Sequence, residues 1–305
     1  MTVVAAMPSV DTLVSGVVDY AGLFPPAGLD LVTAARNYGA YRTDEHWRLL
    51  GRFIISAAQL DEFHGAAAKA LPRRRTDEPW RLSVLAGPDL AADLARITIF
   101  NNAYAKGPSG RAMVDAVEGK AATVAEIDAL ATATPRTFEL FIEIPIDPDP
   151  APLLAAIARR GARAKVRTGG VTPDAIPSTA LLARFMAGAV RARVAFKATA
   201  GLHHPVRAMH PLTYAADSPR AIMHGFFNVF LAAAFLGTGA TETDAVAVLE
   251  ETDPLAFRFA PGGLRWRDRH LTTTDLRTTR EQIARAFGSC SFREPVDDLR
   301  ALHLL

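Results

Sequence analysis

Residues 163–170 read RAKVRTGG, and residues 194–204 read VAFKATAGLHH. Each stretch is a short strand-like run that carries a lysine in its interior and ends in glycine. Successive side chains on a strand face opposite ways, so Lys165 and Lys197 point away from the apolar residues that alternate with them. On an open sheet these lysines would meet water, but inside a closed barrel they would meet each other and a ligand.

Strand-like and helix-like segments alternate along the rest of the chain. The other predicted strands span residues 17–20, 52–56, 80–86, 112–118, 137–144 and 256–260. The predicted helices span residues 29–41, 59–71, 89–100, 123–131, 150–160, 178–191, 225–236, 242–250 and 275–287. Thr123 and Glu126 form a capping box at one helix start, and Gly161 ends another helix.

Eight strand-then-helix units predict parallel strands that are joined by right-handed crossovers. The chain of 305 residues then fits an α/β fold of the (β/α)8 TIM barrel type. We expect a single domain over residues 1–305, with residues 1–15 as a loose N-terminal extension. The alternative, an open doubly wound sheet, normally carries a glycine-rich dinucleotide loop after its first strand. Residues 19–23, DYAGL, are not such a loop, and the chain has no P-loop.

Composition and charge limit the partners of this protein. The chain has 34 basic and 32 acidic residues, a net charge of +2, which indicates neither nucleic acid nor an anionic membrane as a partner. The longest apolar stretch, residues 225–237, is too short to span a bilayer. The apolar helix within it would serve equally as core or as the face of a homo-oligomer.

Cysteine usage and the N-terminus point to a compartment. The N-terminus has no basic segment ahead of an apolar run and does not read as a signal peptide. The single cysteine, Cys290, fits a reducing compartment, so we expect a cytoplasmic protein. Cys290 follows the last predicted helix, away from the predicted barrel mouth, and we interpret it as a structural residue.

Charged side chains gather at the ends of neighbouring predicted strands, where barrel enzymes place their catalytic groups. The alternation in strand 137–144 turns Glu143 away from the apolar face, and Glu118 ends the strand before it. Arg167 and Thr199 follow the two lysines. Poorly paired buried charges cost several kcal/mol each, so we expect a fold that keeps so many to use them. The alternative is a buried ion network that only fills the barrel.

Two close lysines have a known chemical use. Desolvation and a neighbouring cation both lower the pKa of an amine, so we expect a neutral amine to be available near neutral pH. Such an amine attacks a carbonyl to form a Schiff base, which is an electron sink for breaking or making a carbon-carbon bond. Glu118 or Glu143 would then move protons, and this chemistry needs no cofactor.

The pattern Lys-x-x-x-Gly occurs on both stretches, as KVRTG at residues 165–169 and KATAG at residues 197–201. In this the chain resembles the deoxyribose-phosphate aldolase type of class I aldolase. The resemblance implies that the sixth-strand lysine, Lys165, forms the Schiff base. It also implies that the seventh-strand lysine, Lys197, tunes the reactivity of the first.

Glycines follow the predicted sixth, seventh and eighth strands and indicate a place for an anion. Gly169 and Gly170, Gly201, and the pair at residues 262–263 would expose backbone N–H groups at loop and helix starts. Arg167 would add a bidentate contact to a carboxylate or phosphate. The alternative is that these glycines only turn the chain.

Two histidines and an aspartate complete the set of candidate site residues. His203 and His204 lie just past the seventh predicted strand, and Asp19 lies on the first. Adjacent histidines on extended backbone face apart, and no pair of residues has convincing zinc-ligand spacing, so we predict no metal site. We expect the histidines to act as acid, base or substrate contacts and Asp19 to contribute to the site, although loop and capping roles are open to all three.

The leading hypothesis is therefore a lyase that acts on a small anionic carbonyl compound through Lys165 or Lys197. A second hypothesis keeps the barrel but lets histidines and carboxylates hold a divalent metal for lyase or isomerase chemistry. A third is a barrel that binds an anionic metabolite without catalysis, with purely structural charges.

Overall fold

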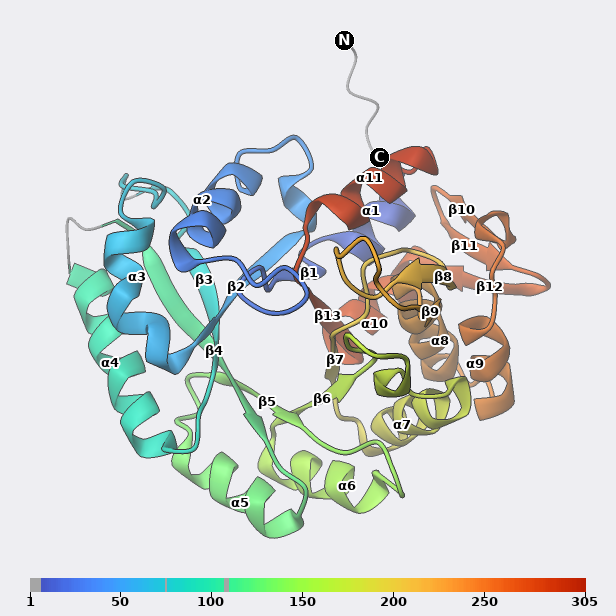
Figure 1. The fold of residues 1–305 in the computed structure, drawn as a ribbon. Coiled ribbons are helices and arrows are strands. Elements are labelled where there is room, and N and C mark those ends of the chain that lie inside the picture. Colours follow the sequence, from blue (N-terminus) through green and yellow to red (C-terminus); the bar gives the residue numbers. More distant parts are fainter. Residues whose placement is uncertain (1–6, 75, 107–109) are drawn as a thin grey trace.

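Eight parallel strands close into a barrel in the computed structural model of the chain, which describes residues 7–74, 76–106 and 110–305. Their order around the barrel is β1-β13-β7-β6-β5-β4-β3-β2, so the chain belongs to the predicted (β/α)8 TIM barrel class (Figure 1). The barrel strands are β1 (Val18–Tyr20), β2 (Leu50–Ser56), β3 (Trp80–Leu85), β4 (Ala112–Lys120), β5 (Glu139–Glu143), β6 (Arg163–Arg167), β7 (Phe196–Thr199) and β13 (Ala284–Ser289).

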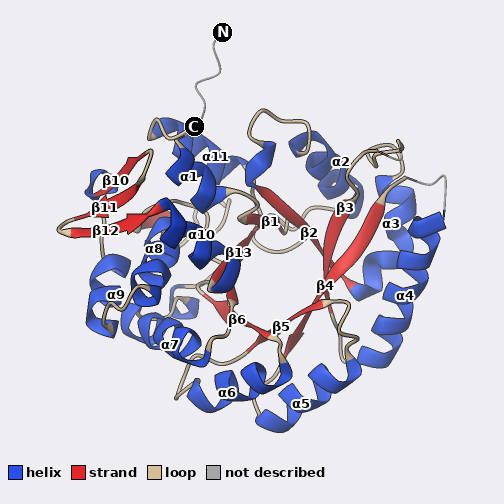
Figure 2. Cartoon of the chain, turned by 180° about the vertical axis from the view of Figure 1, so that it is seen from behind, coloured by secondary structure: helices blue, strands red, loops and turns tan. Residues whose placement is uncertain are grey.

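Helices surround the barrel on its outside, as the view from behind shows (Figure 2). They are α1 (Pro8–Val14), α2 (Leu31–Tyr41), α3 (Leu60–Ala67), α4 (Leu90–Lys106), α5 (Val124–Ala133), α6 (Ala151–Arg160), α7 (Thr179–Ala192), α8 (Phe226–Gly237), α9 (Glu242–Leu249), α10 (Thr273–Gln282) and α11 (Arg293–Ala301). The capping box of Thr123 and Glu126 starts α5, and Gly161 ends α6 at φ +67°, both as predicted. None of the described helices has both the length and the apolar composition needed to cross a membrane.

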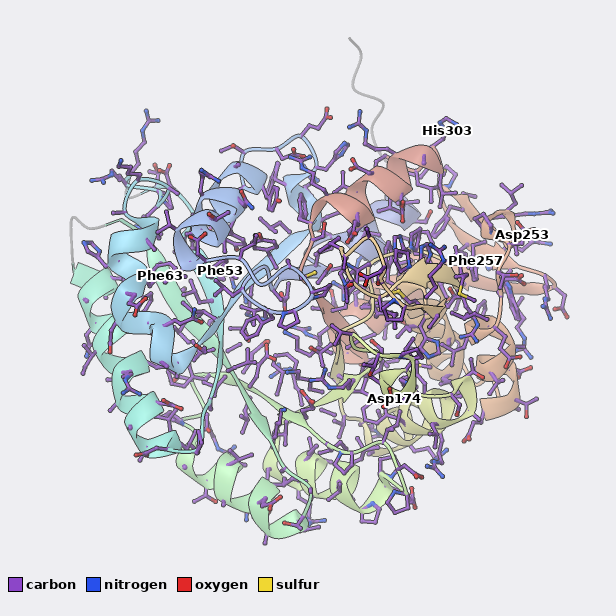
Figure 3. The ribbon with its side chains drawn as sticks, viewed as in Figure 1. Phe53, Phe63, Asp174, Asp253, Phe257 and His303 are labelled. Atoms are coloured by element: carbon purple, nitrogen blue, oxygen red, sulfur yellow. The ribbon has the colours of Figure 1, made fainter. Side chains whose placement is uncertain are left out.

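Aromatic and aliphatic side chains fill the layer between strands and helices. Figure 3 labels two of them, Phe53 on β2 and Phe63 on α3, whose ring centroids lie 6.2 Å apart. Both side chains are buried. The apolar faces of the strands are therefore covered by helices, and the opposite faces point into the barrel.

The register of the central strands brings the charged residues together. Lys165 on β6 pairs with Glu143 on β5 at one edge and with Lys197 on β7 at the other. Paired residues of parallel strands point to the same side of a sheet. The predicted inward direction of these three side chains is therefore confirmed.

The predicted eighth strand is wrong. Residues 257–260 form β10 (Phe257–Ala260), which pairs antiparallel with β11 (Gly263–Trp266) next to β12 (Arg269–Thr272). This small sheet lies beside α8 and α9, outside the barrel (Figure 1). The glycines at 262–263 thus belong to its first hairpin and do not form an anion site at the barrel mouth.

Barrel closure instead uses residues that we predicted to be helical. The helix expected over residues 275–287 ends at Gln282, and β13 follows it to close the barrel between β7 and β1. The apolar residues Ile283, Ala284 and Phe287 fit a helical period as well as a short buried strand. Pairing with strands that are distant in the sequence decides between the two.

The N-terminal extension is not loose where the structure describes it. Residues 8–14 form α1, whose Val10, Leu13 and Val14 are buried, and Ser9 donates a hydrogen bond to the Ala260 carbonyl at 2.6 Å. An apolar stripe on a short helix is stabilised mainly by such packing, which no local pattern reveals. Residues 1–6 of the predicted extension lie outside the described residues.

The apolar helix α8 is part of the core. Every residue from Phe226 to Leu236 is buried, and the Phe226 ring stacks on Phe287 of β13 at a centroid distance of 5.1 Å. The side chains therefore pack against the barrel, so α8 offers no free face for a partner subunit.

We predict that Phe230→Ala lowers the free energy of unfolding by about 3–5 kcal/mol, because it removes a buried ring from this layer. Urea unfolding followed by circular dichroism measures the change. Leu255→Ala, at a side chain that is 76% exposed, is the control and should change stability by less than about 0.5 kcal/mol. A loss below about 1 kcal/mol for Phe230→Ala would show that α8 is not core in solution.

Candidate active site

Six charged side chains form a continuous line across the C-terminal half of the barrel interior. In order they are Asp19, Lys197, Glu118, Lys165, Glu143 and Arg167. They come from β1, β7, β4, β6, β5 and β6, so only the closed barrel can assemble them. Negative and positive charges alternate along this line, which we call the ion chain.

The inner half of the ion chain holds Lys197. Its Nζ lies 2.5 Å from Asp19 Oδ2 and 2.8 Å from Glu118 Oε1. Ser83 donates a further hydrogen bond to Glu118 Oε1 at 2.6 Å. Lys197 is only 1% exposed, so two carboxylates replace the water that its ammonium group has lost.

The outer half of the ion chain holds Lys165 and reaches solvent. The other oxygen of Glu118, Oε2, lies 2.9 Å from Lys165 Nζ, which also lies 3.0 Å from Glu143 Oε2. Glu143 accepts from Arg167 at 3.2 Å, and the Arg167 side chain is 48% exposed. Glu118 therefore bridges the two lysines, and Arg167 marks the end that an incoming molecule meets first.

The protonation state of Lys165 differs from our expectation. Burial lowers its pKa, but the charges of Glu118 and Glu143 raise it more, so the pKa lies above the ordinary value of 10.5. The predicted lowering of the Lys165 pKa is wrong because two carboxylates contact the amine. Burial and a second cation alone would have lowered this pKa. Lys165 is an ammonium group in the resting site.

The carboxylates respond in the opposite direction. Burial raises the pKa of Glu118, but Lys165 and Lys197 outweigh it and hold this pKa far below the ordinary value. Lys165 and Arg167 likewise overcome burial and lower the pKa of Glu143. Glu118, Glu143 and Lys165 are therefore charged around neutral pH.

A cavity of about 420 Å³ opens over the ion chain at the C-terminal end of the barrel. The rigid loop with Phe24, Pro25 and Pro26 forms one wall, and Leu212 and Met223 form another. Leu212 directly follows β8 (Ala208–Pro211) and Met223 ends β9 (Arg220–Met223), and these two strands form a hairpin between β7 and α8 in the chain. Walls of this kind exclude water from a small bound molecule.

Most of the predicted site residues line this cavity. They are Glu118, Glu143, Lys165, Arg167, Gly170, Lys197, Thr199, Gly201 and His203. The backbone of the loops after β6 and β7 therefore faces the same space as the charged groups, as an anion site requires.

Three predicted residues lie away from this cavity. Asp19 is beneath Lys197, where its Oδ1 also accepts from the Arg52 backbone N–H at 2.7 Å. Gly169 packs so closely on Gly201 that a Cβ atom on Gly169 would lie 2.9 Å from the Gly201 Cα. His204 pairs with Asp298 at 2.6 Å. These residues lie around the site and do not line the cavity, so their predicted substrate contacts stay predictions without support from its lining.

Two lining residues were missed or misread in the sequence. Cys290 directly follows β13 and lines the cavity, because the true eighth strand ends there. Lys120 also lines it, since β4 continues two residues past Glu118. Lys120 lies two residues after Glu118 and so faces the same side of β4, which the sequence could have indicated. No local sequence pattern indicates that β13 is a barrel strand.

A metal site is the alternative chemistry for the histidines and carboxylates of this region. Within the described part of the chain, no group of three or more His, Cys, Asp or Glu side chains is arranged to hold a metal ion. His203 and His204 point to different carboxylates, Glu294 and Asp298, each at 2.6 Å.

We predict that Glu118→Gln lowers the free energy of unfolding by about 3–5 kcal/mol, because it leaves two buried ammonium groups with one carboxylate each. Denaturant unfolding at neutral pH measures the loss. Asp128→Asn is a matched control, since its pair with Arg160 lies on the surface and such exposed pairs contribute little to stability. Equal losses in the two variants would contradict a structural role for the bridge.

The pH dependence of that loss is a separate prediction. The pKa of Glu118 is lower in the folded chain than its ordinary 4.5, so its stabilisation is present above pH 4.5 and disappears as pH falls toward the folded value. The stability difference between wild type and Glu118→Gln should therefore stay constant from about pH 5 to about pH 9 and shrink below about pH 4.5. A difference that grows in acid would contradict this assignment.

Comparison of the chain with protein-family models, curated proteins and solved structures found no match. The resemblance to the deoxyribose-phosphate aldolase type therefore stays a prediction, which rests on the two lysine-bearing strands.

Proposed function

We propose that this protein is an aldolase-type lyase that forms a Schiff base between Lys165 and a small anionic carbonyl compound. The observation that carries the proposal is the position of Lys165, which lies between two carboxylates beneath a cavity at the C-terminal end of the barrel. Lys197 shares Glu118 with Lys165, so a second cation is coupled to the reacting amine through one carboxylate.

Lys165 is the better nucleophile of the two lysines. Lys197 is held between Asp19 and Glu118 at the inner end of the ion chain. Lys165 instead lies next to the Glu143 and Arg167 pair, which ends in solvent. A carbonyl compound that enters from the mouth therefore reaches Lys165 first, and Lys197 acts as a fixed positive charge behind it.

The raised pKa of Lys165 is compatible with this chemistry because the net charge of the site is conserved. An ammonium group and a carbonyl group give a protonated Schiff base and one water molecule, with no net gain or loss of protons. The carboxylates that stabilise the ammonium group also stabilise the protonated Schiff base. The ion chain thus favours the protonated Schiff base, and Lys165 does not need to be a neutral amine before the substrate binds.

The proton movements have acceptors in place. Glu118 Oε2 and Glu143 Oε2 lie 2.9 and 3.0 Å from Lys165 Nζ, within reach for taking its proton. The neutral amine then forms a bond to the carbonyl carbon, and the carbonyl oxygen takes protons and leaves as water. Cleavage of the neighbouring carbon-carbon bond moves its electron pair toward the Schiff-base nitrogen.

The substrate should carry a negative group at the mouth of the cavity. Arg167 and Lys120 line this region and bring two cations to it, next to the glycine loops at Gly170 and Gly201. A carboxylate or phosphate would bind there while the carbonyl points inward to Lys165. The cytoplasmic location and any homo-oligomer remain predictions from the sequence.

Borohydride trapping tests the proposal directly. Incubation with a panel of small keto acids and phosphorylated aldehydes, followed by borohydride, should add one stable mass to Lys165, which mass spectrometry of peptides locates. Lys165→Arg keeps the positive charge but cannot form the imine, so it should lose the adduct. Lys69→Ala, at an exposed lysine on the surface, should keep it.

Two outcomes would contradict the proposal. An adduct on Lys197 in wild type would reverse the roles of the two lysines. No adduct with any compound of the panel would favour a barrel that binds an anion with purely structural charges, or a metal-dependent reaction.

A further inference from the structure

A second group of reactive side chains lies on the same cavity and plays no part in the proposed Schiff-base chemistry. It consists of Cys290, His203, Glu294 and Tyr214, which we call the thiol cluster. Cys290 Sγ lies 3.9 Å from His203 Nε2, and His203 Nδ1 lies 2.6 Å from Glu294 Oε2. The Tyr214 hydroxyl lies 3.2 Å from Glu294 Oε2 and 3.5 Å from Cys290 Sγ.

The fold brings these residues together from four places. Cys290 directly follows β13, His203 follows β7, Tyr214 lies between β8 and β9, and Glu294 lies in the first turn of α11. Both Cys290 and His203 line the cavity, at 6% and 7% exposure. The thiol is therefore shielded from bulk solvent but open to a molecule in the cavity.

The hydrogen bonds determine which nitrogen of His203 faces the thiol as a base. An ionised carboxylate only accepts hydrogen bonds, so Nδ1 must donate its proton to Glu294. This leaves Nε2 to accept the proton of the Cys290 thiol. Burial lowers the pKa of His203, but the bonds to Cys290 and Glu294 raise it to about 9, which favours the proton on His203.

A neighbouring pair shows that the arrangement at His203 is distinct. His204 makes the same contact to Asp298, one helical turn along α11 at 2.6 Å, but its ring stacks on His210 at 3.5 Å. His204 is absent from the lining of the cavity and has no thiol partner. Of these two pairs, the one at His203 joins a thiol, an imidazole and an orienting carboxylate.

We propose that Cys290, His203 and Glu294 form a second nucleophilic site of this cavity, at which the thiol adds reversibly to the carbonyl carbon of a small aldehyde. Sulfur is a strong nucleophile once a base holds its proton, and the orienting carboxylate keeps the imidazole aimed at it. The proposal does not depend on the amine of Lys165.

The reaction balances without another reagent. The Cys290 proton moves to His203 Nε2, and the sulfur forms a bond to the carbonyl carbon. The electrons of the carbon-oxygen π bond move to oxygen, which then takes the proton back from His203. The product is a neutral hemithioacetal, and His203 is left as a neutral imidazole with its bond to Glu294 intact.

Alkylation by iodoacetamide measures the activation of the thiol. Cys290 is the only cysteine of the chain, so every thiol signal reports this site. At pH 7 we expect His203→Gln and Glu294→Gln to slow alkylation of the folded protein by about tenfold or more. The matched control Asp298→Asn removes the carboxylate partner of His204 and should leave the alkylation rate unchanged. Equal rates in wild type and His203→Gln would overturn the proposal.

Carbon-13 NMR tests the aldehyde adduct itself. Propanal labelled at its carbonyl carbon is added to the Lys165→Arg protein, so that no Schiff base forms at that position. A hemithioacetal resonance is expected there and should vanish in the double variant that adds Cys290→Ser. A resonance that survives in the double variant, or none in either protein, would overturn the proposal, whereas the borohydride result at Lys165 is unaffected.

Discussion

The carboxylate of Glu118 is the contact on which the rest of the site depends. One oxygen binds Lys165 at 2.9 Å and the other binds Lys197 at 2.8 Å, in a setting where Glu118 is only 3% exposed. Without this carboxylate two ammonium groups would face each other in a region of low dielectric, at a cost of several kcal/mol. Because Glu118 lies between Lys165 and Lys197, each ammonium group contacts a carboxylate and the charges alternate in sign.

The barrel is what makes this line possible. Parallel strands hold Glu143, Lys165 and Lys197 at one level, and strands β1 and β4 add Asp19 and Glu118 from the sides. Closure removes sheet edges and leaves the interior to side chains alone. The same enclosure that makes an unpaired charge costly also strengthens each pair and fixes its geometry.

The cavity above the ion chain has two chemically different sides. The side of β5 and β6 presents an amine between carboxylates and ends in the exposed Arg167. The side of β13 presents a thiol beside an imidazole. Amines and thiols in general are nucleophiles for carbonyl carbon, and an aldol-type cleavage of a carbon-carbon bond yields two carbonyl fragments. Lys165 and Cys290 therefore face one cavity as two separate groups.

The sequence by itself determined the barrel class and the inward direction of Lys165, Lys197 and Glu143, because strand parity repeats every two residues and is a local property. Only the tertiary structure decided which strand closes the barrel, since residues 284–289 suit a helix or a strand until β1 and β7 pair with them. The tertiary structure also decided the protonation state of Lys165 and the contact between Cys290 and His203. A pKa and a hydrogen bond depend on partners distant along the chain, and no spacing within one strand encodes them.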